Sequence, residues 1–218
     1  MLEFLFKCMV RLLMVMTVLP AHEYAHGWIA YKLGDPTAKN QGRLTLNPIR
    51  HLDPIGSLAL VLTGFGWARP VPVNPFYFKN RKAGMAITAA AGPIANLIIA
   101  YFGYLLIKIL AFLPFYNAPL QMIFMALSII TSVSVTLAVF NLIPIPPLDG
   151  SRILGFFLPE RTYFQIMQYE RFITIGLFLL LFSGALDTPI EVVSSFFFRL
   201  LDGLTGYVDL LAPLFGAR

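Results

Sequence analysis

The sequence predicts an all-α polytopic membrane protein: a helical bundle with a short β-like or re-entrant segment between the first two long spanning segments. Two observations predict this class. Hydrophobic residues make up 58% of the 218 residues and charged residues only 12%, which departs strongly from ordinary globular usage. The apolar residues also come in runs that approach the length of a membrane span. Residues 1–218 are therefore interpreted as a single intramembrane domain.

The first helix is expected from about Leu2 to Leu33, and it carries the most informative motif, His22-Glu23-Tyr24-Ala25-His26. Residues four apart share one helix face, so His22 and His26 are placed to bind one zinc ion. Glu23 is next to the first ligand, where a carboxylate can deprotonate a zinc-bound water. Ionisable side chains are costly inside a membrane, which favours a functional site. The alternative is a chance motif whose histidines only bond to neighbouring helices.

The section from Asp35 to Lys82 is the least helical part of the chain, because six prolines interrupt it. Two stretches within it, 42–46 and 71–73, are typical of short edge strands. Between them, Ile55 to Phe65 is apolar but too short to span, which favours a re-entrant or interfacial segment. Irregular backbone at membrane depth must be buried in protein or line a cavity. This section is therefore expected to form a wall of the site.

Two further spanning segments are expected at about Met85–Leu113 and Leu120–Ile143, joined by the uncharged turn Pro114–Pro119. The stretch Pro144–Arg171 is a polar interruption that contains several prolines. C-terminal helices are expected within residues 172–215, and the pattern leaves the number of spans there open.

The net charge of +5 reflects topology rather than a nucleic-acid surface. Eight basic residues lie between the first two spanning segments: Lys32, Lys39, Arg43, Arg50, Arg69, Lys79, Arg81 and Lys82. The positive-inside bias places such a section in the cytoplasm. The chain is therefore expected to be a multi-pass protein of the lipid bilayer, with the metal site toward the cytoplasmic side. Nothing in the pattern indicates an oligomeric state.

A catalytic zinc site requires a third protein ligand. No further glutamate occurs before Glu160, and His51, the only other histidine, lies in the basic section, where a solvated or capping role is favoured. The remaining candidate is Asp149, which ends an apolar segment and is followed by Gly150. An equally weighted alternative makes Asp149 the N-cap of a following helix.

Two separated motifs, HEYAH in the first helix and NLIPIPPLDG after a later one, resemble the site-2 protease family of intramembrane zinc metalloproteases. The loop GRLTLNPIRHLDPIGS and the segments FGWARPVPVNP and AAAGPIANL are similar to its short members, which lack PDZ and nucleotide-sensing domains. The resemblance covers about residues 21–150. It implies that His22, His26 and Asp149 bind zinc. It further implies that Glu23 is the general base and that Asn141 contacts the substrate or an oxyanion.

Two asparagines have competing interpretations. An amide N–H of Asn141 can donate to a scissile carbonyl on which negative charge develops, and the alternative is an interhelical hydrogen bond. Asn96 follows a run of small residues, and helix packing or shaping of the substrate path is favoured there over chemistry.

The leading hypothesis is a single metalloprotease domain with core motifs in residues 21–150 and one Zn²⁺ per chain. It would hydrolyse peptide bonds in or near transmembrane segments of membrane-protein substrates. The alternative is a metal-binding membrane protein without hydrolytic activity, such as a divalent-cation carrier with a His/Asp transport site. Glu23 favours the hydrolase, since a carrier needs no general base beside two metal ligands.

Overall fold

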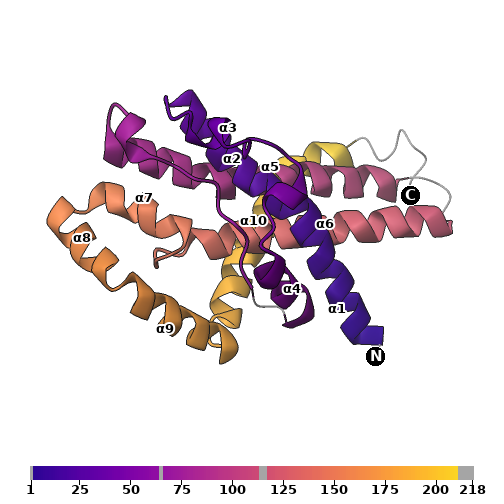
Figure 1. Ribbon diagram of the computed structural model, residues 1–218. Helices are drawn as coiled ribbons and strands as arrows, with labels where there is room; N and C mark the ends of the chain where they lie inside the picture. Colours follow the sequence, from indigo (N-terminus) through magenta and orange to yellow (C-terminus); the bar gives the residue numbers. More distant parts are fainter. Residues whose placement is uncertain (1, 64–65, 113–116, 211–218) are drawn as a thin grey trace.

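The computed structural model describes residues 2–63, 66–112 and 117–210. All regular secondary structure in these residues is helical, as the sequence predicts (Figure 1). In chain order the elements are α1 (Leu2–Leu13), the π-helix η1 (Met14–Val18), α2 (Leu19–Lys32), α3 (Thr37–Asn40), η2 (Pro48–Arg50), α4 (Pro54–Thr63), η3 (Pro75–Tyr77), α5 (Arg81–Ala111), α6 (Ala118–Leu142), α7 (Asp149–Phe157), α8 (Glu160–Gln168), α9 (Glu170–Phe182) and α10 (Asp187–Asp209).

Three helical stretches in the described residues are long and apolar enough to cross a membrane: Phe4–Lys32, Arg81–Ala111 and Ala118–Leu142. They confirm the three long spans predicted from the sequence. Helices α8 and α9 together pass the same test but are bent by 65° at their junction, which allows up to four spans. The chain is thus a multi-pass membrane protein.

The first span is one continuous helix with a π-helical turn, η1, in its middle. Pro20 follows this turn closely, and a proline removes one backbone donor from a helix. Such irregular turns often occur beside functional sites. Here the turn lies immediately before the histidine motif, on the same helix.

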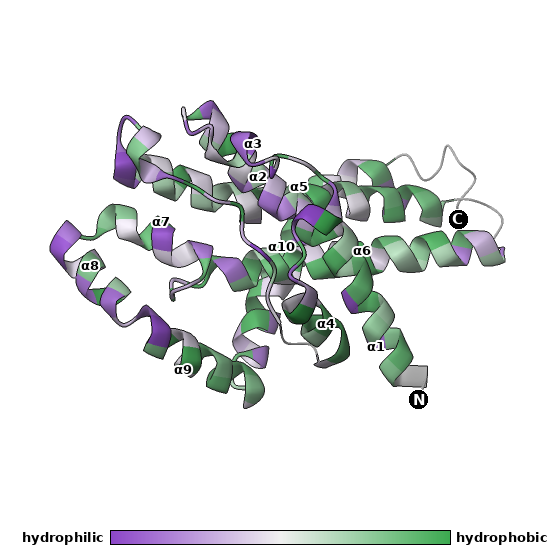
Figure 2. Ribbon diagram, viewed as in Figure 1, coloured by the Kyte–Doolittle hydropathy of each residue, from purple (hydrophilic) through white to green (hydrophobic). Residues whose placement is uncertain are grey.

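The bundle is built around α5 and α6, which pack along each other, with α2 packed against α5 (Figure 1). Helix α10 covers both, and its Leu201 joins Ala100, Val135 and Val139 in a buried apolar cluster. At the far end of α5, Lys108 Nζ lies 2.8 Å from carboxylate oxygens of Asp202 and Asp209. Figure 2 shows hydrophilic residues around α3, the start of α5 and α8, while α6 and α9 are mostly apolar.

The predicted re-entrant segment is a short apolar helix, α4, of 10 residues. It lies beside α1, where the Arg11 guanidinium donates to the carbonyls of Val61 and Leu62, each at 3.2 Å. A charged donor at the last carbonyls of a helix compensates groups that the helix itself leaves unpaired. The side chain of Arg11 therefore has partners despite its apolar helix.

The prediction of short β-like stretches at 42–46 and 71–73 is wrong: neither forms a strand, and the described residues contain none. The physical reason lies in the backbone groups around Val71. Prolines 70 and 72 have no N–H to donate to a ladder. The Val71 N–H donates to a side chain, and the Arg43 side chain occupies the carbonyls of Arg69 and Pro70. Few groups remain for strand pairing.

Three predicted features extend beyond the described residues. Residues 64–65 of the apolar segment, residues 113–116 at the turn after α5, and residues 211–215 of the C-terminal tail lie outside them.

Candidate metal centre

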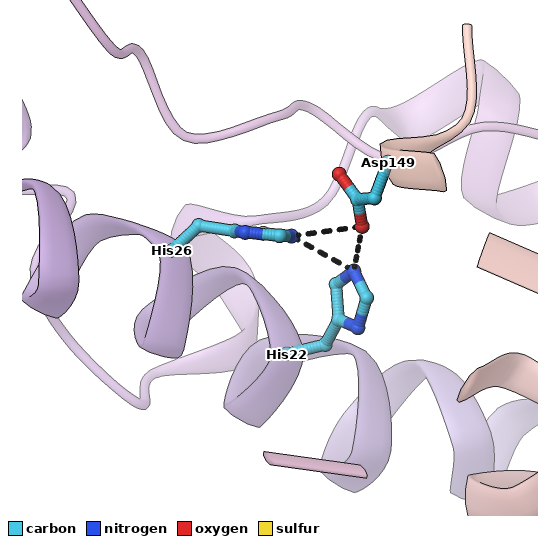
Figure 3. A group of neighbouring side chains, drawn as sticks. All are labelled: His22, His26 and Asp149. Atoms are coloured by element: carbon cyan, nitrogen blue, oxygen red, sulfur yellow. Dashed lines mark hydrogen bonds and ion pairs between the residues drawn. The ribbon is translucent and has the colours of Figure 1, made fainter. Parts of the chain in front are cut away.

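Three side chains predicted from separate motifs meet in the interior (Figure 3). The Nε2 atoms of His22 and His26, on successive turns of α2, lie 3.0 Å apart. Asp149 Oδ2 lies 3.2 Å from each of these nitrogens. All three residues are buried. In the described part of the chain they are the one group of three or more metal-ligating side chains within reach of one ion.

The position of Asp149 depends on the proline-rich turn between α6 and α7. Asp149 is the first residue of α7, the N-cap position belongs to Leu148, and no side-chain capping bond forms there. The N-cap alternative for Asp149 therefore does not describe this helix. A Cβ on Gly150 would collide with the carbonyls of Leu142 and Ile143. The glycine thus lets the turn fold tightly against the end of α6, which directs the carboxylate toward the histidines.

The three atoms fit a zinc ion. His26 Nδ1–H donates to the Thr88 carbonyl at 2.7 Å, so in the neutral ring Nε2 carries the free lone pair. Asp149 Oδ2 is buried, and none of the described residues donates a hydrogen bond to it. The three side-chain atoms lie 3.0–3.2 Å from one another and are placed to share one cation. Ligand atoms about 2.0–2.1 Å from a tetrahedral zinc lie roughly 3.3 Å apart, close to the spacing seen here.

Helix α5 leaves space for such an ion. A Cβ on Gly92 would collide with His26 Nε2 and would lie 2.6 Å from His22 Nε2. Any residue other than glycine would therefore occupy the space beside the ligand atoms. Two imidazoles and one carboxylate form one of the donor sets that catalytic zinc sites use.

Glu23 lies beside this cluster and is held through one oxygen. Its Oε2 accepts a hydrogen bond from the Val71 N–H at 2.8 Å. The segment that carries Val71 is fixed in turn by Arg43, whose guanidinium donates to the carbonyls of Arg69 at 2.7 Å and Pro70 at 3.2 Å. The pKa of Arg43 is lowered mainly by partial burial and, to a smaller extent, by the positive charge of Arg69. The Glu23 carboxylate opposes that shift. The general-base candidate therefore has a defined orientation.

Both asparagines lie near the cluster. The Asn141 amide donates to the carbonyl of Leu137 at 3.0 Å, within its own helix, so the interhelical bond considered from the sequence is not the one observed. Asn96 is fully buried, and its side-chain amide lies 3.0 Å from His22 Nδ1. The sequence pattern favoured packing or shaping of the substrate path for Asn96 and did not predict this contact. The sequence signal for this contact was the four-residue spacing between Gly92 and Asn96, which places both on one helix face.

His51 takes no part in the cluster. It is fully buried rather than solvated, and its Nε2–H donates to the carbonyl of Thr45 at 2.7 Å. Its own carbonyl accepts from the Arg69 N–H at 2.9 Å. The side chain thus stabilises the irregular section that leads to Val71.

A cavity of about 620 Å³ opens onto the cluster. His22, Glu23 and Asn141 line it together with mostly apolar side chains of η1, α4, α6, α9 and α10. The sequence predicted the wall formed by the irregular section, here Trp67 and Ala68. It did not predict the part of the lining contributed by α9 through Leu177 and Phe178.

Fold and site together define a polytopic membrane protein with a buried cluster of two histidines and one carboxylate that could hold a metal ion. The model of peptidase family M50 matches residues 10–183, and the chain belongs to this family. The resemblance to site-2 proteases predicted this assignment.

Similar proteins carry matching names. The chain is 43% identical over 166 residues, 74% of each chain, to "Putative zinc metalloprotease YwhC" of Bacillus subtilis. It is 32% identical over 136 residues to "Putative zinc metalloprotease Rip2" of Mycolicibacterium smegmatis, covering 59% of this chain and 49% of that protein. The Mycobacterium tuberculosis H37Rv protein of the same name is 28% identical over 173 residues, 76% of this chain and 64% of the relative. No solved structure matches the chain significantly. The chain is a zinc metalloprotease with Zn²⁺ as its cofactor.

Proposed function

We propose that this zinc metalloprotease is an intramembrane endopeptidase that cuts membrane-protein substrates in or near their transmembrane segments. The observation that supports this most strongly is the position of the cavity. It leads from Glu23 and His22 to apolar walls contributed by spanning helices and by α9. A cavity of about 620 Å³ with such walls suits an apolar peptide segment better than a polar soluble one.

In this proposal His22, His26 and Asp149 hold the zinc ion, and Glu23 and Asn141 act on the reacting groups. When bound, zinc supplies Lewis acidity to the scissile carbonyl and to the attacking water. Glu23 takes a proton from that water and returns it to the leaving amine. The Val71 N–H engages one oxygen of Glu23, at 2.8 Å, so the other is available for proton transfer. Asn141 lines the same cavity and has a second amide N–H to offer to the developing oxyanion.

Cleavage within a bilayer is the expected result of a reconstitution experiment. A model transmembrane substrate with a Gly-Pro pair in its helix should be cut when it shares vesicles with the purified protein, because a weakened helix exposes its peptide bonds. Mass spectrometry of the products locates the cut site. Protein with Glu23→Gln, prepared identically, is the control for contaminating proteases. Cuts confined to the soluble flanks, far from the apolar segment, would contradict the proposal.

We infer that the basic section between α2 and α5 faces the cytoplasm, so that the metal centre lies nearer that side. The support is the eight basic residues from Lys32 to Lys82, which include the adjoining ends of the two helices. By contrast, the turn at residues 114–119, between α5 and α6, contains no charged residue.

Cysteine labelling tests this orientation. In a Cys8→Ser background, single cysteines at Lys39 or Lys82 should react with a membrane-impermeant reagent only after the cytoplasmic side is opened. A cysteine at Asn117 should react in intact cells. The reverse pattern would invert the topology and place the metal centre nearer the outer face.

A further inference from the structure

Helix α5 presents one stripe of residues to the two histidines of α2. Thr88, Gly92 and Asn96 are spaced by four, so they lie on one helix face. The stripe runs antiparallel to the motif: Thr88 meets His26, and Asn96 meets His22. Gly92, between them, faces both Nε2 atoms. One face of α5 therefore contacts both imidazoles.

The contact between His26 and Thr88 fixes the tautomer of the neutral His26 ring. A backbone carbonyl only accepts hydrogen bonds, so His26 Nδ1 must carry the proton that Thr88 binds at 2.7 Å. That proton leaves Nε2 free to bind a metal. Metal-binding histidines commonly donate their other ring N–H to a carbonyl or carboxylate in this way, which fixes the tautomer and the ring orientation.

His22 also needs an acceptor for its Nδ1–H, but its neighbour on α5 is a side-chain amide instead of a backbone carbonyl. For Nε2 of His22 to bind the metal, its Nδ1 must be protonated and needs an acceptor. The neighbour within reach is the Asn96 amide, at 3.0 Å. Asn96 is fully buried, and its Oδ1 lacks a hydrogen-bond partner among the described residues while Nδ2 faces the ring. A half-turn of the amide brings Oδ1 to Nδ1–H without changing the shape of the side chain.

We propose that Asn96 is a positioning residue that accepts a hydrogen bond from His22 Nδ1–H and so holds His22 as a metal ligand. The proposal rests on the assignment of His22, His26 and Asp149 as the zinc site. It accounts for a buried polar side chain in a membrane helix whose neighbours Ile94 and Ile98 are exposed. In this arrangement each histidine has an acceptor for its Nδ1–H: the Asn96 side chain for His22 and the Thr88 carbonyl for His26.

Zinc affinity of purified full-length variants tests the proposal independently of proteolysis. Asn96→Leu keeps the approximate size and removes the acceptor, and losing such a partner should weaken zinc binding about 10- to 100-fold. Asn96→Asp offers only acceptor oxygens and should retain zinc. The matched control is Thr88→Val on the same stripe: the Thr88 hydroxyl is buried and unpartnered in the described structure, and His26 binds its backbone carbonyl. Competition with a chromophoric chelator measures each dissociation constant with zinc alone.

The outcomes separate the alternatives. Loss in Asn96→Leu with retention in Asn96→Asp and Thr88→Val supports the proposal. Equal loss in Asn96→Asp and Asn96→Leu would overturn it, because Asn96 would then act as a donor. Wild-type affinity in Asn96→Leu would also overturn it. If Asn96→Leu does not fold, Asn96→Ala, which also removes the acceptor, takes its place under the same criteria. Zinc retention in His22→Ala would instead overturn the underlying metal site.

Discussion

Alanine in place of His22, His26 or Asp149 is expected to empty the zinc site and to abolish proteolysis. Each side chain supplies one of three converging atoms that lie 3.0–3.2 Å apart in a buried cluster. A catalytic zinc site has only three protein ligands, since water takes the fourth position, so no other side chain replaces a ligand that is lost. The loss should therefore exceed the roughly 10- to 100-fold effect typical of a partner that only supports a ligand.

Metal analysis of purified protein provides the measurement. Wild-type protein should carry about one zinc per chain, as expected of a single three-ligand site, and each alanine variant should carry far less. His51→Gln is the matched control, because it changes the remaining histidine while keeping a donor for the Thr45 carbonyl. A His51→Gln variant without zinc, together with an Asp149→Ala variant that keeps it, would show that the third ligand is wrongly assigned.

The clustering of the two histidines in the candidate metal site could be predicted from sequence because it follows a local rule. The spacing of His22 and His26 on a helix fixes their common face whatever surrounds them. No such local rule places Asp149. Its contact with the histidines of α2 depends on the turn after α6 and on Gly150, which packs against that turn. The sequence alone left an N-cap as an equal alternative, and the family resemblance favoured the ligand.

The irregular section shows where local pattern fails. Residues 71–73 have strand-like composition, yet side chains distant in sequence occupy backbone groups of residues 69–71. Strand formation depends on which partner reaches the backbone, and composition does not report that. The same limit applies to Asn96, whose contact with His22 arises from packing of α5 on α2.

Glu23→Gln is expected to remove proteolysis while leaving zinc bound. Glutamine keeps the size of the side chain and retains a carbonyl oxygen, so it can still accept the hydrogen bond that Val71 N–H donates at 2.8 Å. Both imidazoles remain in place. What disappears is the group that takes and returns the proton, a contribution of about 10²- to 10⁴-fold in rate.

Asn141→Ala provides the comparison within the same cavity. If its free amide N–H donates to the oxyanion, cleavage should fall about 10²- to 10³-fold, again with zinc retained. In the described structure the amide is bonded to Leu137 within α6, so its loss should leave the metal cluster intact. A loss of zinc in Asn141→Ala would point to a structural role instead.

The Glu23→Gln experiment also separates the hydrolase from a metal carrier. A carrier would bind zinc and show no cleavage in either form, whereas the hydrolase loses a measurable activity and keeps its metal. The assay compares cleavage of the transmembrane substrate in vesicles, zinc content, and co-purification of uncut substrate, which should persist in the variant. Glu23→Gln should be at least as damaging as Asn141→Ala, because proton transfer occurs in both directions through one carboxylate. Undiminished cleavage by Glu23→Gln, in a preparation free of other proteases, would overturn the role of Glu23 as the base.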